Sequence, residues 1–391
     1  MWLALLALAV WLYLLCFHGR FWSSAPQLPR ADLRTLAPGA LPPVDVIVPA
    51  RDEVATIAPV IASLLQQDYP GGLRIILVDD NSTDGTAAAA AGANADAGAS
   101  KLLVLSGEPK PADWSGKLWA VQQGVRASTA PLLLLTDADI VHESGHVSAL
   151  VAHLLSARVN LVSEMVRLNC ESLAERALVP AFVYFFQMLY PFARVNDPGS
   201  AVAAAAGGTV LIRRATLAEL GGLEAIRGAL IDDVTLARMA KHHGPIFLGH
   251  SGLARSIRPY AQASAIWDMI SRTAFTQLRH SALLLLLTLI GLTLVWLVPP
   301  WAALSGVAQL RSYLSAPRDP MMQQWQAWAG MAACVLAAAS YQPTLRRYRC
   351  NPLWCLALPA IALFYMAATL ASACKHWFGV GATWKARTYR A

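Results

Sequence analysis

Two aspartates, Asp137 and Asp139, stand at the end of an apolar segment, Leu132–Ile140, that reads LLLLTDADI. Its apolar run of strand length ends in Thr136 and shows no polar–apolar alternation, which predicts a strand buried on both faces of a parallel or mixed sheet. Carboxylates at the carboxyl end of such a strand lie at the edge where open α/β sheets bind ligands. Two carboxylates one residue apart can bind a divalent cation, which can neutralise a diphosphate. In the alternative interpretation, both aspartates only cap the next turn or helix.

A second acidic pair, Asp79 and Asp80, follows the apolar segment Leu73–Val78 and begins the run D-D-N-S-T-D-G. These carboxylates could accept hydrogen bonds from the base or ribose of a nucleotide. The alternative is that they only form the turn and cap the following helix, as Asp and Asn often do. Because two strands end in paired acids, we favour the ligand-binding interpretation.

The segments around these acids alternate between strand and helix patterns. The predicted strands are Val44–Val48, Leu73–Val78 and Leu102–Leu105, and the predicted helices are Ile57–Gln67 and Leu118–Ala127. This βαβα order predicts an α/β domain with a mainly parallel sheet, whose carboxyl edge carries the acids.

Neither of two glycine-rich phosphate-binding motifs occurs in the sequence. A dinucleotide-binding loop requires G-x-G-x-x-G after the first strand, where this chain has P-A-R-D-E, and the Walker A pattern is absent. Carboxylates repel a diphosphate, so a divalent cation, Mg²⁺ or Mn²⁺, must bridge the two.

The composition predicts a globular domain held at a membrane. The 391 residues are 56% hydrophobic and 14% charged, and the apolar excess is concentrated at both ends of the chain. The net charge of +7 fits a membrane surface or an anionic substrate. The basic residues are scattered, so we expect no nucleic-acid partner.

The amino-terminal segment Met1–Phe17 is almost wholly apolar, and we expect an uncleaved anchor, with a cleaved signal peptide as the alternative. Arg20, Arg30 and Arg34 follow it, which places the next domain in the cytoplasm by the positive-inside rule. The expected organisation is an anchor (1–20), a linker (21–43), a catalytic domain (44–260), an interfacial segment (261–280) and a membrane region (281–391).

Three hydrophobic stretches in the last part of the chain are long enough to span a bilayer: Ser281–Trp301, about Gln324–Tyr341, and Pro352–Ala373. The arginine-rich loop Gln342–Cys350 should be cytoplasmic. Simple alternation then puts the C-terminal tail outside, although its basic residues argue for inside. An interfacial or re-entrant stretch is one way to reconcile the two signals.

Two further segments leave alternatives open. The aromatic segment Glu175–Val195 contains Pro180 and Pro191, which we expect to interrupt it. It fits an interfacial helix beside a lipid acceptor, or a buried core helix. His242, His243 and His250 lack metal-ligand spacing, so we expect them on the surface or in loops.

Six motifs occur in one order along roughly Val44–Tyr260: VIVPARDE, ILVDDNSTDGT, WSGKLWAVQQG, LLLLTDADI, GGTVLIRR and LIDDVTLA. Together they resemble the family 2 glycosyltransferases, which have the GT-A fold. The later run RPYAQASAIWDMISRTAFTQLR, followed by hydrophobic stretches, resembles the membrane-bound, hopanoid-biosynthesis-associated members of that family.

This resemblance implies roles for the matching positions. The residues that would line the nucleoside pocket are Arg51, Glu53, Asp79 and Asp80. Asp137 and Asp139 would bind the metal, with Asp137 also contacting the donor. Lys117 would approach the phosphates or the sugar, although an ordinary helix-surface lysine is the alternative.

Asp233 matches the acid of the family's E-D-x-x-L motif, and Asp232 stands where Glu is commoner. A carboxylate opposite the leaving group can remove the proton of an acceptor hydroxyl as a general base. In-line attack at the anomeric carbon then inverts its configuration. The alternative role for Asp233 is to cap the start of a helix.

Arg272, Gln277 and Arg279 precede the next hydrophobic stretch and could form an interfacial gate over the diphosphate. Processive polysaccharide synthases of the family carry Q-x-x-R-W, whereas this chain reads Q-L-R-H at Gln277–His280. This difference favours transfer of a single sugar.

We therefore expect an inverting glycosyltransferase on the cytoplasmic face of a bacterial inner membrane. It would use a nucleotide-sugar donor and a membrane lipid acceptor, with a hopanoid as one candidate. The alternatives are transfer to a polyprenyl phosphate, a processive polysaccharide synthase, and a membrane scaffold with an inactive GT-A domain.

Overall fold

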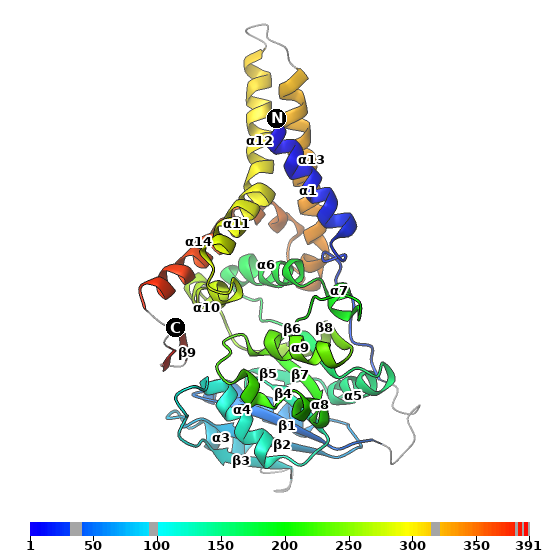
Figure 1. The fold of residues 1–391 in the computed structure, drawn as a ribbon, viewed down its shortest axis with the longest axis vertical. Helices are drawn as coiled ribbons and strands as arrows, with labels where there is room; N and C mark the ends of the chain where they lie inside the picture. The colour runs from blue at the N-terminus through cyan, green and yellow to red at the C-terminus, as the bar shows by residue number, and fades with distance from the viewer. Residues whose placement is uncertain (32–40, 94–100, 314–320, 380–381, 385–386, 390–391) are drawn as a thin grey trace.

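The computed structural model describes residues 1–31, 41–93, 101–313, 321–379, 382–384 and 387–389, so part of the expected linker (21–43) lies outside the described residues. An α/β layer forms one end of the molecule, and helices from both ends of the chain form the other (Figure 1). The helix α6 (Leu173–Leu189) lies between these two parts.

Within the described ranges, one eight-stranded sheet has the order β3-β2-β1-β4-β7-β6-β8-β5. Its strands are β1 (Val44–Ala50), β2 (Leu73–Asp79), β3 (Leu102–Ser106), β4 (Leu132–Thr136), β5 (Ile140–His142), β6 (Leu161–Arg167), β7 (Thr209–Arg213) and β8 (Ile246–Ser256). The expected parallel arrangement holds for β3-β2-β1-β4, but β7 runs antiparallel to both β4 and β6, and β5 antiparallel to β8. The sheet is therefore mixed, because an apolar run predicts a buried strand without giving its direction.

Alternate residues of β1 enter two different cores. Val46 and Val48 pack with α2 (Val54–Leu65) and α5 (His146–Ser156) on one face of the sheet. Ile47 packs into the core on the other face, where α4 (Gly116–Ala127) lies. A strand buried on both faces needs apolar residues at successive positions, which is why β1 shows no alternation.

The aromatic segment forms α6 and the short α7 (Phe192–Asn196). Pro180 lies inside α6, so the expected interruption there is wrong, and only Pro191 separates the two helices. A capping box between Ser172 and Glu175 starts α6. Because its middle is buried against helices from the last part of the chain, α6 fits the core-helix interpretation.

The remaining long helices are α1 (Trp2–Phe17), α10 (Ala263–Gln277), α11 (Ala282–Leu292), α12 (Val298–Tyr313), α13 (Met321–Arg347) and α14 (Leu358–Trp377). Among the described residues, two helical stretches are long and apolar enough to cross a membrane, Ala282–Ala308 and Pro352–Trp377. The helix α1 has 16 residues and is shorter than that. The expected span at Gln324–Tyr341 lies within α13 and is not among the two, since it is rich in Ala and carries Gln residues.

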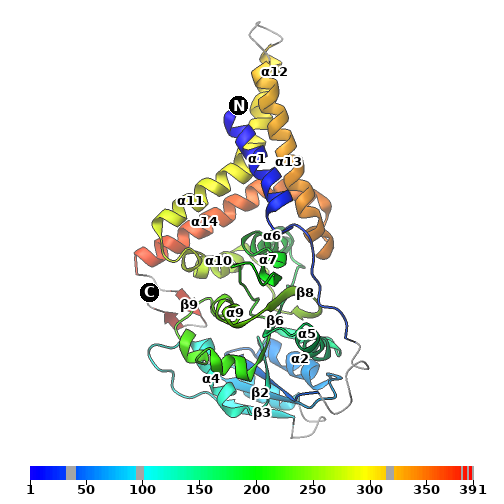
Figure 2. The same cartoon turned by 45° about the vertical axis from the view of Figure 1, so that its right-hand side comes forward.

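Contacts near both ends of α14 connect this helix to the rest of the molecule. A short 3₁₀ helix joins its start to the end of α13, where Arg347 donates a hydrogen bond to the carbonyl oxygen of Ser251 on β8. Near its other end, Lys375 Nζ donates to Ser271 Oγ on α10 at 2.9 Å. Figure 2 shows α14 running beside α11 and down to α10, whereas α12 and α13 extend away from the layer.

Gly124 allows α4 to pack closely on β1, because a Cβ atom there would lie 2.5 Å from Ile47 Cγ2. We expect Gly124→Ala to lower the free energy of unfolding by about 1–3 kcal/mol through overpacking. Gly92→Ala, in the open end of α3 (Thr86–Gly92), should raise it by up to about 1 kcal/mol. Thermal unfolding of both variants tests this, and equal melting temperatures would contradict the tight α4–β1 contact.

Candidate active site

Asp137 and Asp139 lie in the turn between β4 and β5. The expected end of the apolar strand at Thr136 is confirmed, because β4 ends there. The chain turns there because β5 pairs with β8, with Ile140 opposite Ser256, instead of continuing beside β1. The turn brings both carboxylates to the carboxyl edge of the sheet, as the pattern predicts.

Asp139 is held by the end of β8. Its Oδ2 accepts hydrogen bonds from Ser256 Oγ at 3.0 Å and from Arg258 Nε at 2.8 Å. Burial raises the pKa of Asp139, the Arg258 guanidinium opposes that shift, and the charge of Asp137 adds to it. The two carboxylates are thus close enough to repel each other, which favours a cation between or beside them.

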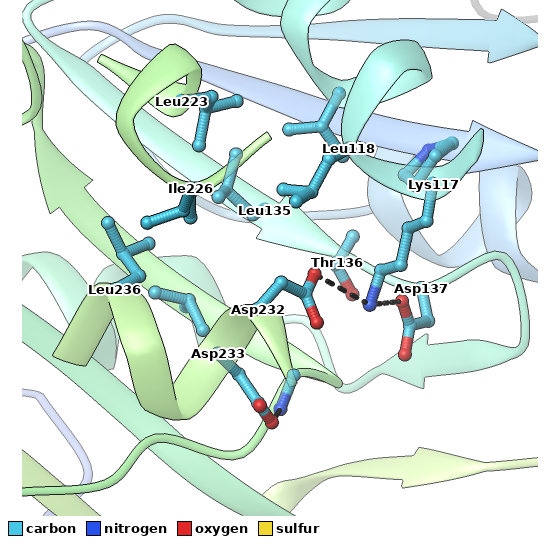
Figure 3. Close-up of a pocket in the computed structure, with 14 residues that line it drawn as sticks. Lys117, Leu118, Leu135, Thr136, Asp137, Leu223, Ile226, Asp232, Asp233 and Leu236 are labelled. Atoms are coloured by element: carbon cyan, nitrogen blue, oxygen red, sulfur yellow. Dashed lines mark hydrogen bonds and ion pairs between the residues drawn. The ribbon is translucent and has the colours of Figure 1, made fainter. Parts of the chain in front are cut away.

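Lys117 connects the aspartate turn to the start of α9 (Asp232–His243). Its Nζ lies 2.8 Å from Asp137 Oδ1 and 3.7 Å from Asp232 Oδ2 (Figure 3). Burial would lower the pKa of Lys117, but the Asp137 and Asp232 carboxylates outweigh burial and raise it. The alternative of an ordinary surface lysine therefore does not fit, because this ammonium is paired with two acids.

Asp233, the predicted base, faces the same pocket from the first turn of α9. Its Oδ2 accepts the backbone N–H of Gly207 at 2.8 Å, and its Oδ1 accepts that of Val234 at 2.8 Å. Burial raises the pKa of Asp233 to about 7, and the neighbouring Asp232 adds to the shift. A carboxyl with a pKa near neutrality can gain and lose a proton at ordinary pH, as general-base chemistry requires.

Gly207 lets these groups approach one another. A Cβ atom at this position would lie 3.2 Å from Asp233 Oδ2 and 3.4 Å from Lys117 Nζ. Any larger side chain at position 207 would therefore separate the lysine from the base, so the close approach of these two groups requires glycine there.

The predicted nucleoside residues meet at the ends of β1 and β2. Arg51 Nη1 donates to the carbonyl oxygen of Asp80 at 2.7 Å. Asp79 Oδ1 accepts the Ser82 N–H at 3.2 Å, so this carboxylate takes part in the turn, as the alternative interpretation predicts. Glu53 Oε1 lies 2.6 Å from Arg258 Nη2.

Arg258 is the functional candidate that sequence reasoning missed. It donates to Glu53 from one nitrogen and to Asp139 from another, so it links the nucleoside end to the cation end. Several acids at one edge of the sheet predict that basic side chains lie nearby to compensate their charge. The sequence does not show which arginine does so, because Arg258 is 119 positions away from Asp139.

The three predicted gating residues lie in different surroundings. Gln277 donates to the hydroxyl of Tyr190. Arg272 lies in α10, and its side chain is partly buried. Arg279 is exposed beyond the end of α10 and makes no side-chain hydrogen bond or ion pair with the described residues.

The histidines follow the prediction only in part. His242 and His243 end α9 and are exposed. His250 is fully buried in β8, so its expected surface or loop position is wrong. The segment around His250 forms a strand, and the ring of Phe192 packs against the His250 ring.

The donor set fits a divalent cation that is shared with a ligand. Among the described residues no group of three or more His, Cys, Asp or Glu side chains is arranged to hold a metal ion. Asp137 uses Oδ1 and Asp139 uses Oδ2 for the contacts above, so in the described part of the chain their other oxygens accept no hydrogen bond. These are hard oxygen ligands of the kind that Mg²⁺ and Mn²⁺ bind, with phosphate and water oxygens completing the shell.

The sequence profile of the family described as "Glycosyltransferase like family 2" matches residues 42–273. An uncharacterized glycosyltransferase of Mycobacterium tuberculosis (strain H37Rv) is 36% identical over 111 residues, 28% of this chain and 43% of that protein. An N-acetylglucosaminyltransferase of Bradyrhizobium elkanii is 32% identical over 120 residues, 29% of this chain and 60% of that protein. The chain thus matches less than two thirds of each relative's length.

Among solved structures, the mannosyltransferase PcManGT from Pyrobaculum calidifontis, in complex with GDP-Man and Mn²⁺, resembles this chain with a TM-score of 0.56. The alignment covers 95% of this chain and 97% of that one at 21% sequence identity. At this identity the likeness shows the fold alone.

Arg258 offsets two buried carboxylates, so we expect Arg258→Met to lower the free energy of unfolding by about 3 kcal/mol. Arg258→Lys should lower it less, because it keeps the charge but loses the two-pronged geometry. The control is Arg255→Met, which changes an exposed arginine of the same strand. If chemical denaturation gave the same loss for both methionine variants, the bridging role of Arg258 would be wrong.

Proposed function

Because the chain belongs to glycosyltransferase-like family 2, we propose that it transfers one sugar from a nucleotide-sugar to the hydroxyl of a membrane lipid, with inversion at the anomeric carbon. The observation that carries this proposal is the placement of Asp233 in one pocket with Lys117 and Asp137. A hydroxyl acceptor needs a base, whereas a diphosphate leaving group needs positive charge, and the pocket contains both.

The donor would lie along the acids at the sheet edge. Glu53, Asp80 and Arg51 would bind its nucleoside part, and Asp137 and Asp139 would hold Mg²⁺ or Mn²⁺ beside its diphosphate. When bound, the cation stabilises the negative charge that develops on the leaving group. Lys117 adds a second positive charge close to Asp137, 2.8 Å away.

The acceptor would enter from the side of Gly207 and α6. Asp233 takes the proton of the acceptor hydroxyl as the new glycosidic bond forms, and its raised pKa keeps the carboxylate basic enough to do so. The backbone N–H groups of Gly207 and Val234 fix the carboxylate in this orientation. Hydrophobic residues Leu223, Ile226 and Leu236 line the same pocket and would exclude water.

A membrane location is supported by the apolar surface of the helical part. Leu283, Leu286, Leu287 and Ile290 of α11 are all exposed, as only a lipid environment would favour. We propose that α1 and the α11–α13 hairpin enter the bilayer while residues 44–260 face the cytoplasm. Since α14 runs beside α11 and down to α10, where Lys375 donates to Ser271, this helix would rest in the interface and keep the basic tail inside, in agreement with the positive-inside rule.

A hopanoid is one candidate for the acceptor lipid. A polyprenyl phosphate is the nearest alternative, but its phosphate oxygen needs little help from a base. A processive synthase is less suited, because the Q-x-x-R-W motif is missing. An inactive scaffold would have no reason to keep four acids paired with Lys117 and Arg258.

We expect Asp233→Asn to lower the transfer rate by a factor of about 10²–10⁴, because the amide cannot accept the hydroxyl proton. Detergent-purified protein would be given bacterial lipids, Mn²⁺ and labelled nucleotide-sugars, and label entering the lipid phase would be counted. Asp232→Asn is the control and should retain far more activity. Equal transfer by wild type and Asp233→Asn would point to a phosphate acceptor, and no transfer with any donor would favour the scaffold.

The pH dependence offers a second test of the base. Protonation removes the basic form of Asp233, so the transfer rate should fall about tenfold per pH unit below about 7. Asp232→Asn removes the adjacent negative charge that helps to raise this pKa, so its acidic limb should move to lower pH. Rate–pH profiles at saturating substrate measure both, and an unshifted limb would exclude Asp233 as the titrating group.

A further inference from the structure

Behind the turn that carries Asp137 and Asp139 lies a chain of buried polar side chains that no step above uses. It runs from Glu164 on β6 through His146 on α5 and His142 on β5 to Thr136, the last residue of β4. None of these four residues is more than 3% exposed. Polar groups buried this completely are costly unless they bond to one another, so their arrangement needs a reason.

The four side chains are joined by consecutive contacts. Glu164 Oε2 lies 2.5 Å from His146 Nε2, and the two histidine Nδ1 atoms are 2.7 Å apart. His142 Nε2 lies 3.2 Å from Thr136 Oγ1, which also donates to the carbonyl oxygen of Gly208 at 2.8 Å.

This series of four polar side chains contacts the active site at two points. Thr136 directly precedes Asp137, and Gly208 directly follows Gly207, whose N–H binds Asp233 Oδ2 at 2.8 Å. The Thr136 hydroxyl therefore ties the cation-binding turn to the segment that holds the base.

The contacts also fix where the protons lie. The short bond to Gly208 takes the Thr136 proton, so Thr136 accepts from His142 Nε2–H, and His142 Nδ1 in turn accepts from His146 Nδ1–H. Burial lowers the pKa of His142 well below its ordinary value, in agreement with a neutral ring. A proton must then lie between His146 Nε2 and Glu164 Oε2, because two bare acceptors would repel each other there.

We propose that Glu164, His146 and His142 are positioning residues that orient Thr136, so that the Asp137–Asp139 turn and Asp233 keep their relative places. This inference rests on the proposed function, because it assumes that a divalent cation binds at Asp137 and Asp139. The three residues touch neither donor nor acceptor, and act by restricting the turn through Thr136.

A purely structural role makes a different prediction. If the chain only filled the core, Glu164→Leu would lower stability by leaving His146 Nε2 without a partner, but cation binding by the folded protein would not change. If the chain orients the turn, what matters is a donor facing His146 Nε2. Gln supplies that donor and Leu does not, so this pair of substitutions separates the two roles.

The experiment compares Glu164→Gln and Glu164→Leu with wild type. Mn²⁺ is titrated in the presence of UDP or GDP, free Mn²⁺ is followed by its electron paramagnetic resonance signal, and thermal unfolding is recorded in parallel. We expect Glu164→Leu to weaken Mn²⁺ binding by about tenfold or more, the usual range for residues that orient metal ligands, and Glu164→Gln to restore it nearly to the wild-type value.

Thr136→Val provides a second variant that keeps the shape and removes the hydroxyl, and it should weaken Mn²⁺ binding as Glu164→Leu does, even if the latter fails to fold. Wild-type affinity in both Thr136→Val and folded Glu164→Leu would overturn the positioning role while leaving the proposed function intact. A wild-type protein that binds no Mn²⁺ with either nucleotide would overturn the cation site and the positioning role together.

Discussion

Mutual repulsion among carboxylates is the constraint on which the rest of this structure depends. Five acids meet at the carboxyl edge of the sheet, namely Glu53, Asp137, Asp139, Asp232 and Asp233. Removing charged groups from water costs several kcal/mol per ion unless opposite charges and hydrogen bonds compensate. Two cations, Lys117 and Arg258, supply that compensation, and each lies between two acids.

The fold brings these two basic side chains to the carboxyl edge of the sheet. Lys117 arrives because Ser115 caps α4, which places the first turn of that helix at the end of β4. Arg258 arrives because β8 runs beside β6 and passes the turn between β4 and β5, where Ser256 also contacts Asp139. The strand that delivers the second cation, β8, runs parallel to β6, and the antiparallel β5 beside it carries the chain on from the aspartate turn.

Much of this arrangement follows from the sequence, and the remainder fails for identifiable reasons. Local patterns locate β1, β2, β4 and the acids after them, because strand ends and acid pairs are neighbours in the chain. Arg258 was not predictable, since its partners lie far away in the sequence. His250 was misplaced for a related reason, because burial by Phe192 depends on tertiary contacts that no local pattern contains.

The same carboxylates must satisfy two demands that oppose each other. They need compensation by Lys117 and Arg258 for the domain to fold, yet they must still offer oxygens to a cation and to a hydroxyl proton. Asp137 and Asp139 meet both demands by using one oxygen each for a fixed cation. Asp233 accepts hydrogen bonds from backbone N–H groups, whereas a full ion pair would lower its pKa. Burial therefore raises its pKa to about 7. Incomplete neutralisation is therefore what allows these acids to act in chemistry.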